Sequence, residues 1–209
     1  MAKEVLGLFG GTFAPPHNGH VYALGKFLEA VKPDRTVVMP TGIPPHKYKA
    51  AGDTPGIRLE MCREAFGAFP GTEVSDYEIL RAGKSYTYLT LEHLYAPGRE
   101  IVMLCGSDMF LTLSGWYRAP EIFRLATVAA LTREPALDAR MRETAARYEG
   151  DWGARVILIG AEPLKLSSTE VRRRIREGGS LCGLLPEGVE RIVRREHLYE
   201  SDDADGEKA

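Results

Sequence analysis

The sequence has few cysteines, no long apolar run and almost no net charge. Its three cysteines, Cys62, Cys105 and Cys182, form no CxxC or CxxH pair, so we expect reduced thiols in a cytoplasmic protein, without a disulfide framework or a cysteine-bound metal. No apolar run is long enough to span a membrane, and no signal peptide is recognisable before the first strand pattern. The formal net charge of -2 gives no general attraction to nucleic acid or to an anionic membrane.

Two common nucleotide-binding fingerprints are also missing. The P-loop pattern GxxxxGK[ST] does not occur, because the tripeptide at 83–85 has Glu78 where the first glycine is needed. The dinucleotide pattern GxGxxG is not found either. Any binding of phosphate must therefore come from another local geometry.

Short apolar runs alternate with helical patterns along the whole chain. The runs are typical of strands buried on both faces of a parallel sheet. They cover residues 4–9, 35–39, 100–106, 126–131 and 155–160. Helices are predicted from about Val21 to Val31 and over 87–95, 135–148, 168–177 and about 186–195.

This alternation predicts an α/β fold in one domain over residues 1–200, a doubly wound parallel sheet with flanking helices. The acidic residues 201–209 lack apolar anchors, and we expect them to form a disordered tail. The longest stretch without periodicity covers residues 40–55, and a loop of that length in a compact domain is often functional.

The segment LFGGTFAPPHNGH, residues 8–20, joins the first strand to the first helix. In open α/β sheets ligands bind at the carboxyl ends of strands, and the glycines at 10 and 11 would let a ligand approach the backbone. A helix N-terminus is a ready anion site, and Pro16 is placed to preset its first turn. His17 and His20 share one helix face and can donate to phosphate oxygens. The alternative is a pair of capping or surface histidines.

A second candidate phosphate site is LKLSSTEVRRRI, residues 164–175. Ser167 is a plausible N-cap, and Glu170 three residues later would complete a capping box. The functional interpretation is that this helix starts after the strand at 155–160, at the same edge of the sheet as the first loop, with Arg172 reaching a phosphate. The arginine run at 172–176 is better explained by this one ligand and a solvated face than by nucleic-acid binding.

The sequence GGTFAPPHNGH followed by SSTEVR resembles the nucleotidyltransferase superfamily that is marked by HxGH and by a late helix start rich in serine and threonine. Further segments are IPPHK, SYTYLTL, GSDMFLTLSGWY, TR and LLPEGVERIVRREHLY, in this order. Together they are similar to the bacterial nicotinate-nucleotide adenylyltransferases over essentially everything except the acidic tail. The resemblance implies the Rossmann-like fold of the HxGH nucleotidyltransferases.

The resemblance also implies residue roles. His17, His20 and Arg172 would be the catalytic residues, stabilising charge on the phosphates of ATP. The implied ATP-binding residues are Gly10, Gly11, Thr12, Phe13, His17, His20, Gly106, Asp108, Ser167, Ser168, Thr169 and Arg172. The implied residues for the pyridine nucleotide and the closing loop are Tyr86, Thr87, Trp116, Tyr117, Arg133, His46 and Lys47. Physical chemistry supports two of these roles: the helix start at Thr87 suits a carboxylate, and Trp116 offers a π-face to a pyridinium ring.

Four of these residues have other interpretations. Trp116 is also compatible with a core position, Asp108 with a helix cap, and the pair at 46–47 with plain loop surface. The sequence departs from the family at Ala14, where an acidic residue is usual, and at Pro16, where an aliphatic one is usual. The loss of that carboxylate bears on how Mg²⁺ is placed.

The implied reaction joins ATP and nicotinate mononucleotide to give deamido-NAD and pyrophosphate, with Mg²⁺ supplied with ATP and no metal bound by the protein itself. Other readings are a preference for nicotinamide mononucleotide, another acceptor for the nucleotidyl group, or a module that binds ATP without chemistry. No nucleic-acid or membrane partner is expected. A homo-oligomer is compatible with the sequence, which leaves the oligomeric state open.

Overall fold

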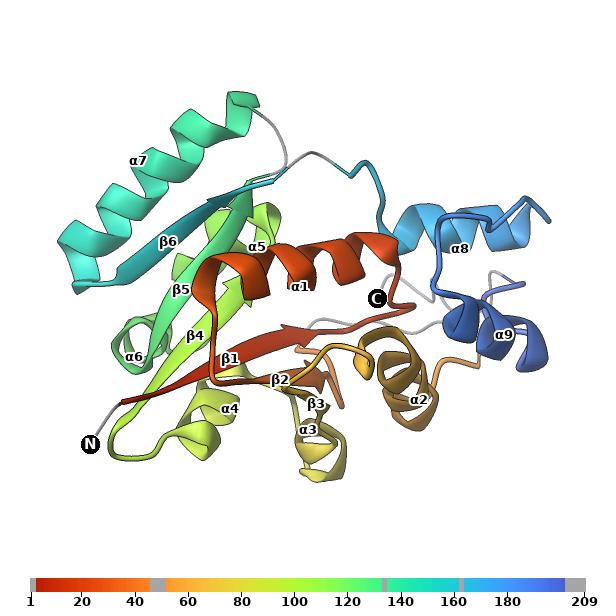
Figure 1. The fold of residues 1–209 in the computed structure, drawn as a ribbon, viewed down its shortest axis with the longest axis horizontal. Coiled ribbons are helices and arrows are strands. Elements are labelled where there is room, and N and C mark those ends of the chain that lie inside the picture. Colours follow the sequence, from red (N-terminus) through yellow and green to blue (C-terminus); the bar gives the residue numbers. More distant parts are fainter. Residues whose placement is uncertain (1–2, 46–51, 133–134, 162–163, 202–209) are drawn as a thin grey trace, which may run out of the picture. The chain divides into compact units, whose positions relative to one another are not determined.

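The computed structural model describes residues 3–45, 52–132, 135–161 and 164–201. Strands and helices alternate along the chain (Figure 1). The strands are β1 (Glu4–Gly11), β2 (Arg35–Pro40), β3 (Thr72–Val74), β4 (Arg99–Cys105), β5 (Ala126–Thr132) and β6 (Arg155–Gly160). The helices are α1 (Asn18–Val31), α2 (Pro55–Phe66), α3 (Tyr77–Leu80), α4 (Thr87–Leu94), α5 (Ser107–Thr112), η1 (Leu113–Gly115, a 3₁₀ turn), α6 (Ala119–Leu125), α7 (Pro135–Trp152), α8 (Ser168–Arg176) and α9 (Glu187–Arg195).

Within these ranges the strands form a six-stranded, all-parallel sheet in the order β3-β2-β1-β4-β5-β6. Leu8 is in register with Met103, which is in register with Val128, which is in register with Val156. The chain order reverses between β1 and β4, so the carboxyl ends of these strands form the switch point at which ligands of such sheets bind. The predicted fold class, a doubly wound α/β sheet, is confirmed.

The five predicted strands differ from the observed bounds by no more than two residues. The interpretation of residues 155–160 as a strand buried on both faces is wrong, because β6 is an edge strand and leaves Arg155 and Ile157 exposed. The three-residue strand β3 and the helices α2, α3, α5 and α6 were not predicted. The helix predicted to end at 148 continues to Trp152.

The chain divides into two compact units. Unit 1 comprises Met1–Gly10, Ala23–Val37 and Tyr86–Leu164, and unit 2 comprises Gly11–Tyr22, Val38–Ser85 and Lys165–Ala209. The predicted disordered tail, residues 201–209, lies outside the described residues except for Ser201. Among the residues that are described, no helix is both long enough and apolar enough to cross a membrane.

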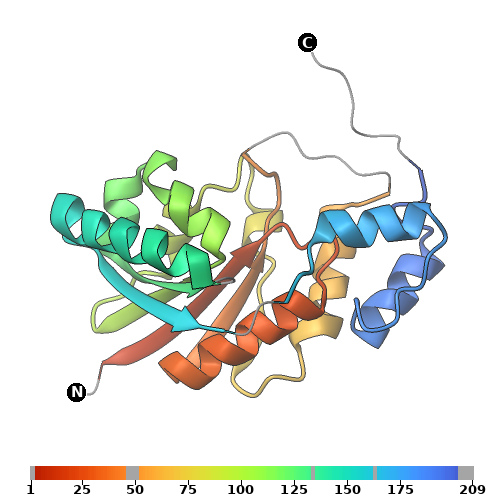
Figure 2. The same cartoon turned by 90° about the horizontal axis from the view of Figure 1, so that it is seen from above.

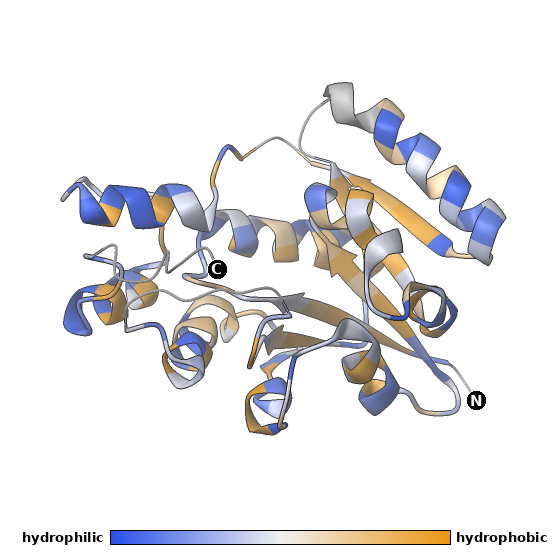
Figure 3. Cartoon of the chain, turned by 180° about the vertical axis from the view of Figure 1, so that it is seen from behind, coloured by the Kyte–Doolittle hydropathy of each residue, from blue (hydrophilic) through white to orange (hydrophobic). Residues whose placement is uncertain are grey.

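In unit 1, helix α7 runs along β6 and also packs on β5 (Figures 1 and 2). Strand β4 is buried from Ile101 to Cys105, and Figure 3 shows hydrophobic residues along the strands of this unit. Gly7 allows the first helix to approach β1 closely, because a Cβ there would lie 2.8 Å from Cε1 of Phe27 and 2.7 Å from Oγ1 of Thr36. Continuous apolar strands therefore make the core of this unit, as their sequence predicts.

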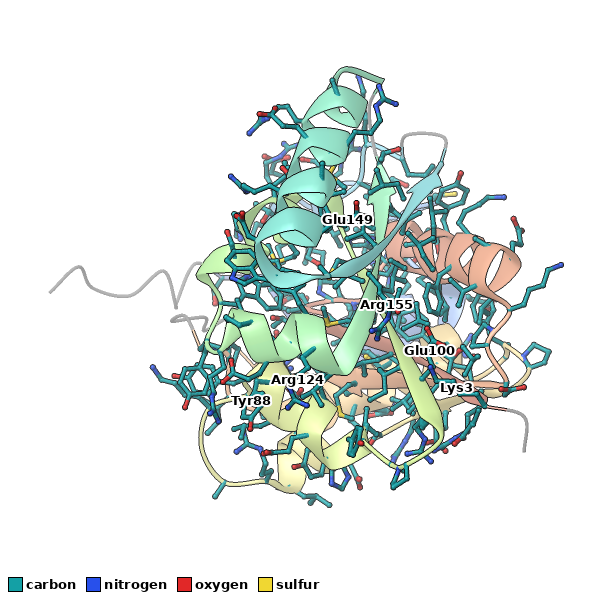
Figure 4. The ribbon with its side chains drawn as sticks, turned by 90° about the vertical axis from the view of Figure 1, so that its left-hand side faces the viewer. Lys3, Tyr88, Glu100, Arg124, Glu149 and Arg155 are labelled. Atoms are coloured by element: carbon teal, nitrogen blue, oxygen red, sulfur yellow. The ribbon has the colours of Figure 1, made fainter. Side chains whose placement is uncertain are left out.

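Charged residues cluster at the amino-terminal ends of the unit 1 strands. Lys3 Nζ lies 3.0 Å from a carboxylate oxygen of Glu100, which also accepts a hydrogen bond of 3.2 Å from the hydroxyl of Thr127. Arg155 Nε donates to the same hydroxyl at 3.0 Å (Figure 4). The ion pair with Lys3 and the bond from Thr127 lower the pKa of Glu100. This cluster lies at the opposite end of the strands from the switch point.

In unit 2, helix α2 packs against α9 and β3, and α8 lies beside α9 (Figures 1 and 2). Helix α9 buries Val189, Ile192 and Val193. Most of α8 is hydrophilic (Figure 3). It ends at Arg176, and a glycine pair follows its cap, where Gly178 adopts a φ of 64° and the N–H of Gly179 donates to the carbonyl of Arg174 at 2.8 Å.

All three cysteines are free thiols, as the sequence predicts. Cys62 and Cys105 are buried and Cys182 is exposed. Burial raises the pKa of Cys105 to about 12, and it also raises the pKa of Cys62. Neither buried thiol is therefore a nucleophile at neutral pH.

Candidate active site

The two predicted histidines lie at the start of α1, in unit 2. The carbonyl of His17 accepts hydrogen bonds from the N–H groups of His20 (2.8 Å) and Val21 (3.2 Å). His17 is therefore the N-cap of α1, and Pro16 precedes the helix instead of presetting its first turn. The two imidazole rings stack with their centroids 3.7 Å apart and an angle of 27° between their planes. The structure thus brings the two side chains together, as the HxxH spacing predicts.

The hydrogen bonding of His20 fixes which of its nitrogens can donate. The backbone N–H of His17 donates to Nδ1 of His20 at 3.1 Å. Since Nδ1 accepts this bond, neutral His20 carries its proton on Nε2. His17 is only 2% exposed, whereas His20 is half-buried. Nε2 of His20 is therefore a hydrogen-bond donor that suits an anionic oxygen.

Sequence reasoning missed the role of Gly19, the residue between the two histidines. A Cβ at this position would lie 2.9 Å from Nδ1 and 3.0 Å from Cε1 of His17. The ring of His17 can therefore stack on His20 only because residue 19 has no side chain. The signal that was available is the glycine inside HNGH.

Phe13, in the loop before α1, packs against the ring of His20. Its ring packs edge-on against His20, with centroids 5.2 Å apart, and against Phe66 of α2 at 5.3 Å. Phe13 is buried and adopts a φ of 51°, in the left-handed region. A Cβ on Gly11 would lie 3.0 to 3.2 Å from the Phe13 ring. Because residue 11 has no side chain, the ring of Phe13 can occupy this position beside His20.

The late serine-rich motif forms the N-terminus of α8, also in unit 2. Ser167 is the N-cap, and its hydroxyl accepts the N–H of Glu170 at 3.2 Å. The second half of the predicted capping box is wrong, because the Glu170 carboxylate binds Arg173 (2.7 Å) and Arg174 (3.0 Å). These two arginines lower the pKa of Glu170 to about 2.

The start of α8 is bonded directly to the loop that precedes the histidines. The hydroxyl of Ser168 donates to the carbonyl of Pro15 at 3.0 Å, and Nη1 of Arg172 donates to the carbonyl of Ala14 at 2.8 Å. Nη2 of Arg172 also lies 3.4 Å from the hydroxyl of Thr169. Residues about 155 positions apart in the sequence therefore meet, and the late motif lies beside the first loop. The sequence placed both at one edge of the sheet but did not predict these direct bonds, and the role of Arg172 in binding a phosphate stays a prediction.

Only one arginine of the run at 172–176 belongs to this site. Arg172 is half-buried, whereas Arg173 and Arg174 are exposed and paired with Glu170. The run is thus one loop-binding arginine on an otherwise solvated helix face. Ala14 is 3% exposed and contributes its carbonyl to the site, where the resemblance leads one to expect a carboxylate.

Three of the residues predicted to bind ATP, Gly10, Gly106 and Asp108, lie in unit 1. Gly10 is at the end of β1, and Gly106 directly follows β4, its parallel neighbour. A Cβ on either glycine would meet no atom within 4 Å, so both backbones are open to a ligand. Asp108 is exposed in the first turn of α5. The cap of that helix is Gly106, so the alternative of Asp108 as a cap is not supported.

The residues predicted to bind the pyridine nucleotide form an aromatic group in unit 1. Tyr86 is the N-cap of α4 and Thr87 its first residue. The ring of Tyr86 lies 4.6 Å from that of Tyr117, centroid to centroid. Trp116 directly follows η1 and is half-exposed, so it is not a core tryptophan. The guanidinium of Arg118 lies over the ring of Tyr88 at 4.4 Å. The start of α4 and the Trp116–Tyr117 turn are thus neighbours.

Three of the predicted residues, His46, Lys47 and Arg133, lie outside the described residues. Over the ranges that are described, no three histidine, cysteine, aspartate or glutamate side chains are grouped so that they could hold a metal ion.

Comparison with known proteins finds relatives that are named as probable nicotinate-nucleotide adenylyltransferases. The sequence profile of the cytidylyltransferase-like family matches residues 8–174. A probable nicotinate-nucleotide adenylyltransferase of Synechococcus sp. is 37% identical, covering 93% of this chain and 94% of its own. The one from Clostridium tetani is 32% identical, with 92% and 97% covered.

Solved structures share the fold. Nicotinic acid mononucleotide adenylyltransferase of Plasmodium falciparum, complexed with NaAD, has a TM-score of 0.77 at 15% identity, covering 94% of this chain and 98% of its own. A putative nicotinate-nucleotide adenylyltransferase from Vibrio parahaemolyticus has a TM-score of 0.63 at 19% identity, with 95% and 96% covered. The sequence match, together with HxGH and the late serine-rich helix bonded to the same loop, places the chain in the cytidylyltransferase-like family, among the nicotinate-nucleotide adenylyltransferases.

Proposed function

We propose that this protein transfers AMP from ATP to nicotinate mononucleotide and releases pyrophosphate, a step of NAD biosynthesis. The observation that carries the proposal is the joining of two phosphate-binding elements in unit 2. The stacked histidines and the start of α8 share one loop, through the bonds of Ser168 to Pro15 and of Arg172 to Ala14. Imidazole, hydroxyl and guanidinium groups are all donors to phosphate oxygens.

The reaction needs no protein nucleophile. A phosphate oxygen of the mononucleotide attacks the α-phosphorus of ATP, a new P–O bond forms, and the bond to the bridging oxygen of the β-phosphate breaks. Pyrophosphate leaves with the electron pair of that bond. The protein contributes position and charge stabilisation, as is general for transfers at phosphorus.

The unit 2 residues divide this work between them. His20, donating from Nε2, stabilises the charge that develops on the oxygens of the α-phosphate, and His17 lies stacked beside it. Ser167, Ser168, Thr169 and Arg172 hold the β- and γ-phosphates at the N-terminus of α8, where the helix dipole favours negative charge. By comparison with other electrostatic donors, loss of the His20 donor costs about 3 kcal/mol in the transition state, or about 100-fold in rate.

The unit 1 residues select the nucleotide parts. The open backbone at Gly10 and Gly106 suits the adenosine, with Asp108 for the ribose. The half-exposed indole of Trp116 offers its face to the pyridinium ring. The first N–H groups of a helix have no partner inside it, so those near Thr87 suit the nicotinate carboxylate.

Mg²⁺ enters with ATP in this proposal. The unit 2 loop offers nitrogen and hydroxyl donors, which fit phosphate oxygens, and at position 14 it has a methyl group. This donor set fits an ion held by the ATP phosphates, where Mg²⁺ offsets charge on the phosphate oxygens. His20 and Arg172 would contact phosphate oxygens directly. Pyrophosphate release should stop on chelation and return with added Mg²⁺.

The deciding experiment is pyrophosphate release with ATP and Mg²⁺, given nicotinate or nicotinamide mononucleotide in parallel. We expect rapid release with the acid, weak release with the amide and about 100-fold slower release in His20→Ala. His197→Ala is the matched control, because its side chain is 77% exposed and pairs with Glu200. Equal release with both mononucleotides would refute the choice of substrate. Release with neither would refute the activity.

A further inference from the structure

A buried arginine that the sequence analysis did not identify lies beside the loop that follows β1. Arg58, in α2, is only 3% exposed. Its Nη1 donates to the carbonyl of Thr12 at 3.1 Å and also to that of Thr41, and its Nη2 donates to the carbonyl of Gly42 at 3.0 Å. Its Nε lies 2.9 Å from Oδ1 of Asp53. One guanidinium therefore binds backbone carbonyls from two separate segments of unit 2.

These bonds fix the orientation of peptide groups in the loop. The carbonyl of Thr12 and the N–H of Phe13 belong to one planar peptide group and point in opposite directions. Arg58, by holding the carbonyl, also sets the direction of the N–H of Phe13. The next peptide group back is held similarly, because the carbonyl of Gly11 accepts the N–H of Thr41 at 2.9 Å. The directions of the N–H groups of Thr12 and Phe13 are thus both fixed by the bonds that their peptide carbonyls accept.

The guanidinium is itself held in place by Asp53 and, through it, by Tyr199. The hydroxyl of Tyr199 donates to Oδ2 of Asp53 at 3.1 Å. The side chain of Asp53 is fully buried, and Tyr199 is 1% exposed. Arginine is suited to this position, because its planar fork presents five donors in fixed directions, whereas lysine presents one compact charge.

A buried ion pair is a poor source of stability. The cost of taking both charges out of water often equals or exceeds their attraction, and apolar residues of the same volume often serve as well. The pair of Arg58 and Asp53 is nevertheless directed at three carbonyls, one of them inside the GGTFAPPH segment. This geometry suits a role in holding the GGTFAPPH segment in one conformation.

We propose that Arg58 is a positioning residue for ATP, and that Tyr199 acts on ATP binding through Asp53 and Arg58 without touching the nucleotide. This inference rests on the proposed function, since it takes the loop at 10–13 to contact ATP. It goes further because it makes the first turn of α2, which carries Arg58, and a tyrosine near the C-terminus contribute to nucleotide affinity. Removing the tyrosine hydroxyl loosens the carboxylate, then the guanidinium, then the loop.

The first test is Tyr199→Phe, which removes one hydroxyl and keeps the buried ring. We expect the Kd for ATP, measured by titration calorimetry, to rise about 5- to 10-fold, which is part of what one hydrogen bond to a charged group contributes, because the hydroxyl acts on ATP only through Asp53 and Arg58. The KM for ATP should rise with it, while the KM for nicotinate mononucleotide stays within about twofold. A structural role alone would move both KM values together.

The matched control is Thr127→Val. It also removes a buried hydroxyl bonded to charged side chains, those of Glu100 and Arg155, but at the amino-terminal end of β5 in unit 1 (Figure 4). It should lower the Tm by a similar amount and leave the Kd for ATP unchanged. An unchanged Kd in Tyr199→Phe, or an equal rise in Thr127→Val, would overturn the proposal.

A second variant tests whether the planar guanidinium of Arg58, which binds three carbonyls, is required. Arg58→Lys keeps the positive charge beside Asp53 but cannot reach three carbonyls, so we expect a rise in the Kd for ATP larger than that of Tyr199→Phe. A smaller rise would overturn the role given to Arg58. If wild-type protein released no pyrophosphate with either mononucleotide, the proposed function would fail. The ATP Kd values of Tyr199→Phe and Thr127→Val would still decide whether this network sets nucleotide affinity.

Discussion

Gly19→Ala should separate activity from stability. The added Cβ would lie 2.9 Å from Nδ1 and 3.0 Å from Cε1 of His17. Comfortable contact between such atoms begins at about 3.5 Å, so the ring must move by about 0.5 Å or more. His17 is 2% exposed and stacked at 3.7 Å on His20. The ring therefore cannot move without disturbing its partner.

The two effects on stability oppose each other. Alanine in place of glycine inside a helix stabilises by about 0.5–1 kcal/mol. Forcing the His17 ring off its rotamer costs about 0.5–1.5 kcal/mol. The net change is within about 1 kcal/mol, which for a chain of this size shifts the Tm by no more than about 4 °C. Activity has no such compensation, since misplacing a catalytic group by about 1 Å costs about 100-fold.

The assay is kcat/KM from pyrophosphate release, with the Tm measured on the same preparations. We expect kcat/KM to fall by about 30- to 100-fold, with little change in Tm. Gly150→Ala is the control: it lies in α7, where a Cβ would meet no atom within 4 Å, and it should keep full activity. If Gly19→Ala stayed within about threefold of wild type, the ring geometry would not matter and the reasoning would fail.

Three further outcomes follow from other contacts. In the native protein a thiol reagent should modify one cysteine, Cys182, and reach the two buried thiols only after unfolding; modification of more than one in the native state would contradict their burial. Glu170→Gln should lower the Tm, and by the largest amount above pH 4.5. The pKa of Glu170 is lowered to about 2 in the folded protein, so its charge adds stability above the unfolded-state pKa of 4.5, and this stability is lost as the pH falls towards 2. If the difference in Tm between the variant and the wild type did not shrink in acid, charge would not be the cause. Tyr148→Phe should cost about 1–2 kcal/mol by urea unfolding, since its buried hydroxyl donates to the carbonyl of Phe110 at 2.8 Å; a cost near zero would mean that this bond adds nothing.

The main strands and the opening motif could be predicted from the sequence because their signals are local. Continuous apolar runs gave β1, β2, β4, β5 and β6 to within two residues. Strand β3 was missed because three residues, Thr72 to Val74, are too short to show a period. Strand β6 was found but its exposure was not, because an apolar run looks the same at the edge of a sheet as in its middle.

The site shows the same division. His17 and His20 are close in sequence, so their pairing could be predicted from spacing alone. Arg58 could not, because its partners lie 5 to 46 residues away and an arginine in a helix is usually at the surface. Gly19 carried a signal, but its reason appears only when the position of the His17 ring is known.

The bonds between the start of α8 and the opening loop also bear on how the chain is made. Ser168 and Arg172 meet Pro15 and Ala14 across 153 and 158 residues. Such long-range contacts close late in folding, since loop closure must precede them. During synthesis the first residues leave the ribosome long before residue 172 exists. A nascent chain therefore carries its histidine motif for most of its synthesis without the partner helix, and the proposed phosphate site is complete only when the last part of the chain has emerged.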